Sequence, residues 1–187
     1  MGSSRVQVCC PSCKTVFLPS VKEVQSRAGA SARRKGANFE RTLAKKFQKW
    51  WGHGVFKRTP MSGGSVLKDG FDMAGDLACN ASDWIWHIEA KNAPGSYAGL
   101  HQFFSAEKFV FWKWWDQACG DCPSNKKVMI VFNRYDQPTM CAALKDDVNF
   151  RILLADIPHM EFITRSKIHF CLWSLDDMLT TSPESWK

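Results

Sequence analysis

The sequence predicts an α/β fold in which helices flank a mixed central sheet. Three observations predict it: a segment with helical periodicity, a group of short strand-like segments after it, and an aromatic helix followed by a continuous apolar run. The chain has 187 residues, enough for one well-buried core and too few for two full domains. We therefore expect one main domain over residues 36–187 and a small N-terminal attachment over residues 1–35.

The N-terminal attachment is basic and contains cysteines. Residues 1–20 carry Cys9, Cys10 and Cys13 around a proline, which is typical of a short knuckle or hairpin. Residues 21–35 are rich in Ser, Ala, Arg and Lys and are expected to form a flexible lead-in.

The first helix is predicted over residues 36–51 and the second over residues 103–118. In the first, three- and four-residue spacing of apolar side chains defines a buried face, and lysines fall mainly on the opposite face. Gly52 and Gly54 end it. The second helix is crowded with Phe and Trp, and its cluster Trp112, Trp114 and Trp115 is more typical of a core than of a base-stacking platform.

The strands are predicted from alternating or continuous apolar runs between polar turns. Residues 55–59, 71–79 and 84–92 are expected to form a three-stranded meander, and the apolar run 128–133 is typical of a buried strand. Further short strands are expected near 139–144, 150–154, 160–163 and 168–173, with a closing helical turn near 175–180. The predicted order is helix, three strands, helix, strand and further strands.

The charge is unevenly distributed along the chain. The net charge is +7, but residues 1–60 hold 13 Lys and Arg against 2 Asp and Glu, and the remainder holds 12 against 16. A concentrated positive field suits a polyanionic partner such as nucleic acid, because each contact with a phosphate releases counterions. The alternative is an ordinary solvated basic surface.

The chain is expected to be cytoplasmic. No apolar run approaches the roughly 20 residues that span a bilayer, and the first 25 residues lack the apolar segment of a signal peptide. In that compartment the eight Cys are better interpreted as thiols or metal ligands than as disulfides. Cys79, Cys141 and Cys171 lie in apolar strands and are expected in the core.

Two carboxylates and a lysine are predicted to share one small volume. Glu89 and Lys91 are two residues apart on a strand and point to the same face, and Asp76 lies on the preceding strand. Carboxylates that face one another are costly to bury unless a cation joins them. Mg²⁺ is the natural occupant, because it accepts a few carboxylates and keeps waters for a phosphate substrate.

These residues resemble the signature of the PD-(D/E)XK nuclease superfamily. The signature is Gly75-Asp76 followed by Ile88-Glu89-Ala90-Lys91, with Gly75 in place of the Pro of the superfamily name. The stretches 36–41 (Gly-Ala-Asn-Phe-Glu-Arg) and 58–64 (Arg-Thr-Pro-Met-Ser-Gly-Gly) are similar to the Holliday-junction-resolvase branch. Residues 112–117, followed by 128–134, look like small phage-encoded resolvases and endonucleases. The resemblance covers about residues 36–134 and implies a restriction-endonuclease-like αβββαβ core.

The resemblance implies a role for each matching residue. Asp76, Glu89 and the carbonyl of Ala90 would hold Mg²⁺, or Mn²⁺ as a substitute, and Lys91 would position or deprotonate the attacking water. Glu40 would bind a second metal or its water, and Gln117 would orient the nucleophile. The candidate DNA contacts are Arg58, Ser62, Arg41 and Lys45.

Several of these assignments have open alternatives. Glu40 could be a surface partner of Arg41 or Lys45, Gln117 could be an ordinary exposed residue, and Asp72 could replace a ligand. His87 is interpreted as structural or DNA-facing.

Two Cys-x-x-Cys pairs suggest a zinc site. Cys10 with Cys13 and Cys119 with Cys122 are the usual halves of a four-cysteine zinc site. The two pairs are so far apart in the chain that zinc would have to join the N-terminal segment to the loop after the second helix. Unpaired reduced thiols are the alternative.

The sequence thus predicts a Mg²⁺-dependent endonuclease of branched DNA. By resemblance, the substrate is a Holliday junction, and its paired strands call for a homodimer with an interface near Trp112, Trp114, Trp115 or the strands after Asn133. A nuclease of linear DNA and a non-catalytic, zinc-containing DNA-binding module are the alternatives. A phage-encoded enzyme would act in the host cytoplasm.

Overall fold

The computed structural model describes residues 8–9, 16–17, 21–59, 71, 75–92, 110–133, 138–148, 156–163 and 168–187. The chain divides into two compact units, Met1–Gly36 and Ala37–Lys187. In the first unit, β1 (Val8–Cys9) pairs antiparallel with β2 (Val16–Phe17). Cys10 and Cys13 of the predicted knuckle lie outside the described residues.

Helix α1 spans Val21–Trp51, so the prediction of a flexible lead-in over residues 21–35 was wrong. Ala, Arg, Lys, Gln and Glu dominate that stretch, and these residues have high helix propensity even where nothing covers them. The exposed side chains of residues 32–35 agree with a helix that local propensity favours there. Beyond Ala37, the predicted apolar face is buried, with Phe39, Leu43 and Phe47 in the core.

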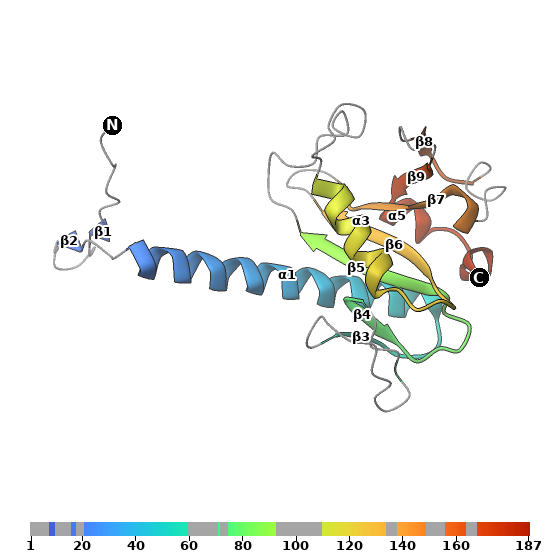
Figure 1. Ribbon diagram of the computed structural model, residues 1–187. Coiled ribbons are helices and arrows are strands. Elements are labelled where there is room, and N and C mark those ends of the chain that lie inside the picture. Colours follow the sequence, from blue (N-terminus) through green and yellow to red (C-terminus); the bar gives the residue numbers. More distant parts are fainter. Residues whose placement is uncertain are drawn as a thin grey trace. The chain divides into compact units, whose positions relative to one another are not determined.

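The second unit is built on a five-stranded mixed sheet (Figure 1), as the sequence predicts. The strand order is β5-β6-β7-β9-β8; β5 and β6 are parallel, and the other neighbours are antiparallel. A parallel pair needs a long crossover connection, and helix α3 (Val110–Asp121) lies in it. The strand bounds are Trp86–Asn92 for β5, Lys127–Asn133 for β6, Met140–Leu144 for β7, His159–Ile163 for β8 and His169–Ser174 for β9.

The predicted three-stranded meander is absent from the described residues. Strands β3 (Phe56–Arg58) and β4 (Leu77–Cys79) form a separate antiparallel pair, and β5 joins β6 instead. β4 begins only after backbone bends at Gly75 and Asp76, where Gly75 has φ +80°, so it is shorter than the strand predicted over 71–79. A backbone hydrogen bond, from Asp76 N to Ile88 O at 2.9 Å, links this turn to β5.

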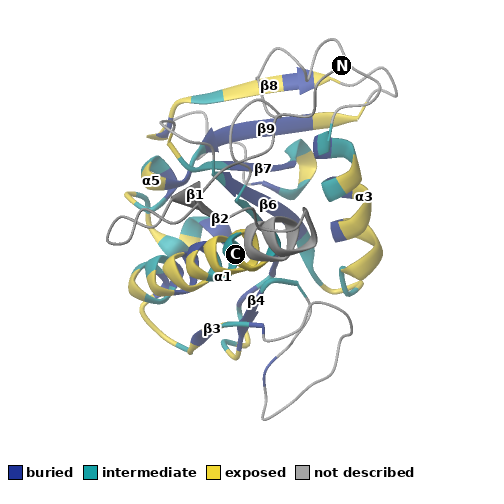
Figure 2. Cartoon of the chain, turned by 90° about the vertical axis from the view of Figure 1, so that its left-hand side faces the viewer, coloured by how far each residue is buried: buried dark blue, intermediate teal, exposed yellow. Residues whose placement is uncertain are grey.

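Alternation along the strands gives the sheet two buried faces. Met129 and Val131 of β6 join the core with α1 and α5 (Leu175–Met178), whereas Ile130 and Phe132 face α3. Figure 2 shows β6, β7 and β9 largely buried and β8 largely exposed. The sheet is therefore covered by a helix on each side, as the α/β class requires.

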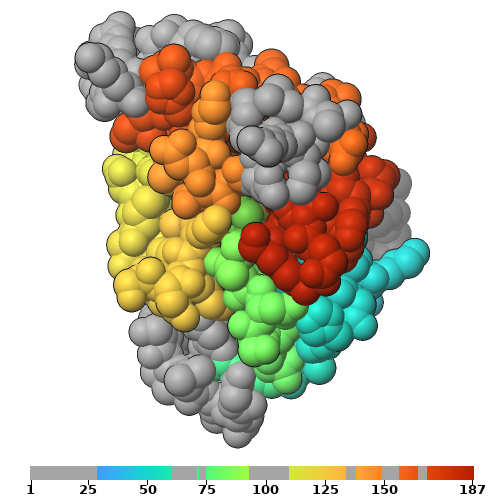
Figure 3. All heavy atoms as spheres, turned by 90° about the vertical axis from the view of Figure 1, so that its right-hand side faces the viewer, coloured from blue at the N-terminus to red at the C-terminus, as the bar shows by residue number. Residues whose placement is uncertain are grey.

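The C-terminal residues close one side of the α1 core (Figure 3). Trp186 lies in the short helix η2 (Pro183–Trp186) and is 3% exposed. Its carbonyl accepts a hydrogen bond from Trp86 Nε1 at 2.9 Å, and Lys187 forms an ion pair with Asp83 at 2.7 Å. The sequence analysis did not predict η2 or the short helix η1 (Lys145–Asp147). The predicted strand 150–154 and residues 103–109 lie outside the described residues.

Candidate active site

Strand β5 presents Glu89 and Lys91 on the face that α3 covers. Trp86, Ile88 and Ala90 alternate with them and point into the core on the opposite face. Glu89 and Lys91 therefore share one face, as their two-residue spacing predicts. Glu89 is 3% exposed and forms an ion pair with the Lys91 ammonium. Lys91 Nζ also donates to Gln117 Oε1 of α3 at 3.3 Å.

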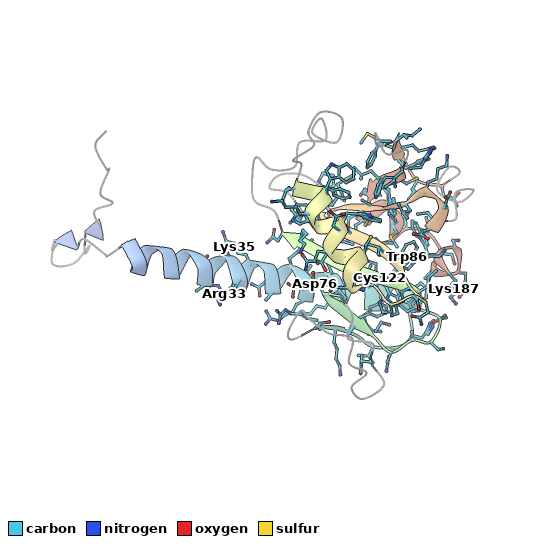
Figure 4. All side chains as sticks on the ribbon, in the orientation of Figure 1. Arg33, Lys35, Asp76, Trp86, Cys122 and Lys187 are labelled. Carbon is cyan, nitrogen blue, oxygen red and sulfur yellow. The ribbon has the colours of Figure 1, made fainter. Side chains whose placement is uncertain are left out.

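Backbone hydrogen bonds hold Asp76 between β3 and β5. Its N–H donates to Ile88 O at 2.9 Å, and its carbonyl accepts from Thr59 N at 3.0 Å. Its carboxylate oxygen Oδ2 accepts from Ala90 N at 2.8 Å. The aspartate therefore reaches the strand that carries Glu89, as the sequence analysis predicted. Figure 4 labels the position of Asp76.

The carboxylates repel one another in a buried setting. Burial raises the pKa of Asp76 to about 7, and the negative charges of Glu89 and Glu40 also act to raise it. The Ala90 N–H and the Lys91 ammonium act in the opposite direction but do not compensate. A group of acidic side chains with too little positive charge is the electrostatic environment that a cation would relieve.

Glu40 and Arg58 form a pair in the structure. Arg58 Nε donates to Glu40 Oε2, and the side chains of Arg58 and Glu40 are 32% and 15% exposed, respectively. Arg41, the alternative partner of Glu40, instead donates to Asn38 Oδ1 at 2.8 Å. Glu40 was predicted to bind a metal and Arg58 a phosphate, and their contact with each other was not predicted.

The remaining candidates are more scattered. Arg41 and Lys45 are exposed on α1. Ser62 and Asp72 lie outside the described residues, as do Cys10 and Cys13. Near the end of α3, Cys119 is exposed, and Cys122 donates to the carbonyl of Pro123 at 3.4 Å. The four-cysteine zinc site stays a prediction.

Three residues near Asp76 have roles that the sequence analysis missed or left open. His87 is 1% exposed and its ring lies against Gly75, which favours the structural alternative over a DNA-facing one. Gly75 allows the turn that places Asp76 against β5. Thr59, which is 5% exposed, lies opposite Asp76. The sequence carries no signal for Thr59, because its place opposite Asp76 depends on the β3–β4 register that the structure shows.

The donor set at this site suits a hard divalent cation. Asp76 and Glu89 offer carboxylate oxygens, and Ala90 lies between Glu89 and Lys91 on the same strand. Within the described part of the chain, no group of three or more His, Cys, Asp or Glu side chains is arranged to hold a metal. Mg²⁺ needs no such group, since it is commonly bound by one or two carboxylates and retains several waters.

We expect Gly75→Ala to lower both stability and any activity that depends on Asp76. A Cβ at this position would lie 2.7 Å from the Ile88 carbonyl oxygen, and the φ of +80° disfavours any side chain. The backbone strain alone should cost about 1–2 kcal/mol of unfolding free energy, and the contact with Ile88 should add to it. Urea denaturation would measure the total.

Gly52→Ala is the matched control for this variant. Gly52 has φ +81°, but a Cβ there would meet no atom within 4 Å. It should show the strain without the displacement of Asp76, and so retain wild-type activity. Equal losses of stability and activity in the two variants would contradict the role assigned to Gly75.

Among the described residues, no helix is both long and apolar enough to cross a membrane.

Comparison with known proteins identifies the family of the chain. The model of a family described as "Phage putative PDDEXK endonuclease" matches residues 31–185. No curated protein and no solved structure matches the chain. The matched range includes both sheet faces, Asp76, Glu89 and Lys91. The chain therefore belongs to this phage PD-(D/E)XK endonuclease family.

Proposed function

We propose that the chain is a Mg²⁺-dependent DNA endonuclease that cuts branched DNA, with a Holliday junction as its substrate. Membership of an endonuclease family supports the nuclease activity. The observation that carries the proposal is that Asp76, Glu89 and Lys91 lie together at one end of β5. There, Ala90 N donates a hydrogen bond to the Asp76 carboxylate, and Lys91 pairs with Glu89.

Each residue of the site has a part in phosphodiester hydrolysis. Asp76, Glu89 and the Ala90 carbonyl would hold the cation, which supplies charge stabilisation at the phosphate and a more acidic water. Lys91 would hold the attacking water and offset the negative charge that develops at the scissile phosphate. Its hydrogen bond to Gln117 would fix the ammonium in place. Mn²⁺ should replace Mg²⁺, because it prefers the same oxygen ligands.

The DNA contacts are expected on the basic surface. Arg58 lies beside the site through its pair with Glu40, and Arg41 and Lys45 are exposed on α1. In this proposal, Arg58 contacts a phosphate near the cut when DNA is bound. The enzyme of a phage would do this in the cytoplasm of its host.

A junction resolvase must present two active sites, so we propose a homodimer. Trp115 is buried between α3 and the sheet, and Trp112 and Trp114 are partly buried there, which makes this cluster a poor interface. The strands after Asn133 are better candidates. Met160 and Ile163 of β8 are 44% and 61% exposed, and Ile168, just before β9, is 42% exposed. β8 is the edge strand of the described sheet, and apolar side chains exposed on both of its faces support pairing of this edge with a second copy.

One experiment tests substrate and assembly together. The protein is incubated with Mg²⁺ and equimolar four-way junction, flap, linear duplex and single strand, and then with a plasmid that extrudes a cruciform. A dimeric resolvase should prefer the junction and linearise the plasmid directly, because both strands are cut in one binding event. A monomer that accumulates nicked circles, or that cuts linear duplex equally well, would refute the resolvase proposal and leave the nuclease proposal intact.

A further inference from the structure

Thr59 lies directly beside Asp76. Its N–H donates to the Asp76 carbonyl at 3.0 Å, which continues the antiparallel register in which Arg58 lies opposite Leu77. Directly opposite residues of an antiparallel pair point to the same face, with Cβ atoms about 5 Å apart. Thr59 and Asp76 therefore form the next backbone pair beyond this ladder.

The hydroxyl of Thr59 is buried and lacks a hydrogen-bond partner among the described residues. The residue is 5% exposed, and its Oγ1 is left without a donor or acceptor there. Other threonines of the second unit differ: the hydroxyls of Thr42, Thr180 and Thr181 each donate to a main-chain carbonyl. A buried hydroxyl without a partner destabilises a protein, so its presence points to a ligand.

The surroundings restrict what that ligand can be. Asp76 already uses Oδ2 to accept from Ala90 N, and its carboxyl group is buried with little compensating charge. At 5% exposure, Thr59 is too enclosed for a DNA phosphate to reach, so a single water molecule is the ligand that would need the least rearrangement around its hydroxyl. Mg²⁺ keeps several of its waters in protein sites, and groups around the ligands hold such waters in place.

We propose that Thr59 is a positioning residue of the nuclease site, whose hydroxyl holds a water ligand of the divalent cation beside Asp76. This role rests on the proposed function, because it assumes that the site binds Mg²⁺. In this role, Thr59 joins the residues around the cation. It directly follows β3, the strand that also contains Arg58.

Thr59→Val removes the hydroxyl and keeps the shape of the side chain. In metal-free protein, the melting temperature should stay the same or rise, since a buried unpaired hydroxyl is lost. The Mg²⁺ concentration for half-maximal cleavage should rise about tenfold or more, as for other groups around metal ligands. The stabilisation of the protein by Mg²⁺, measured as a shift in melting temperature, should shrink in parallel. Thr59→Ser keeps a hydroxyl and should restore both Mg²⁺ responses.

Thr181→Val is the control for a structural hydroxyl. Thr181 donates to Met178 O at 2.7 Å and accepts from Trp186 Nε1 at 2.8 Å, so this variant should melt lower and keep the wild-type Mg²⁺ response. If Thr59→Val behaves like Thr181→Val, fails to fold, or matches wild type in its Mg²⁺ response, the role of Thr59 is refuted. A wild type that neither cuts DNA nor gains stability from Mg²⁺ would instead refute the proposed function itself.

Discussion

Asp76→Asn and Glu89→Gln should each reduce DNA cleavage at least a thousandfold and leave DNA affinity nearly unchanged. A thousandfold loss corresponds to about 4 kcal/mol of transition-state stabilisation, within the several kcal/mol that a bound metal supplies. Both substitutions keep the side-chain shape, and in Asp76→Asn the new amide oxygen could still accept the hydrogen bond from Ala90 N. The loss should therefore report the missing charge and not a rearranged site.

DNA affinity should survive because the basic surface supplies most of it. Residues 1–60 carry 13 Lys and Arg against 2 Asp and Glu, and contacts of this kind with phosphates dominate nucleic-acid binding. Single-turnover cleavage and a binding titration in Ca²⁺ would separate the two effects. Asp116→Asn, which changes an exposed carboxylate one residue from Gln117, is the matched control and should cut normally. Turnover above a tenth of wild type in Asp76→Asn or Glu89→Gln would remove that residue from the cation site.

The parts of the fold that depend on periodicity could be predicted from the sequence. The buried face of α1 beyond residue 37 and the strand β6 follow from the spacing of apolar residues. The common face of Glu89 and Lys91 follows from the period of a strand. Asp76 reaches β5 as predicted, but from a bend before β4 and not from a strand paired with β5. These three candidates could therefore be identified from the spacing of residues along the chain.

What the sequence could not provide depends on contacts between distant segments. The pairing of β5 with β6 rather than β4 is a competition between two possible neighbours, which periodicity does not resolve. The contact of Arg58 with Glu40 joins side chains from different elements. Residues 21–35 show a different limit, because a polar stretch without an apolar face resembles a linker although its residues favour a helix.

The negative charge with which Asp76 would hold a cation should also make the metal-free protein less stable at high pH. Its pKa is raised from 3.8 to about 7 in the folded state, mainly by burial. Between these values, the folded protein keeps a proton that the unfolded chain has lost. Stability should therefore fall as the pH rises through this window and level off above pH 7.

Asp76→Asn isolates this contribution, because the amide does not titrate. In the absence of metal, the variant should gain about 3 kcal/mol of unfolding free energy over wild type on going from pH 5 to pH 8. Urea denaturation of both proteins in EDTA at the two pH values measures the change. Adding Mg²⁺ at pH 8 should stabilise wild type and not the variant, since only the ionised aspartate can hold the cation. A stability difference that stays constant between pH 5 and pH 8 would show that Asp76 is charged in the folded protein without a metal. The cation would then not be what relieves the repulsion among Asp76, Glu89 and Glu40.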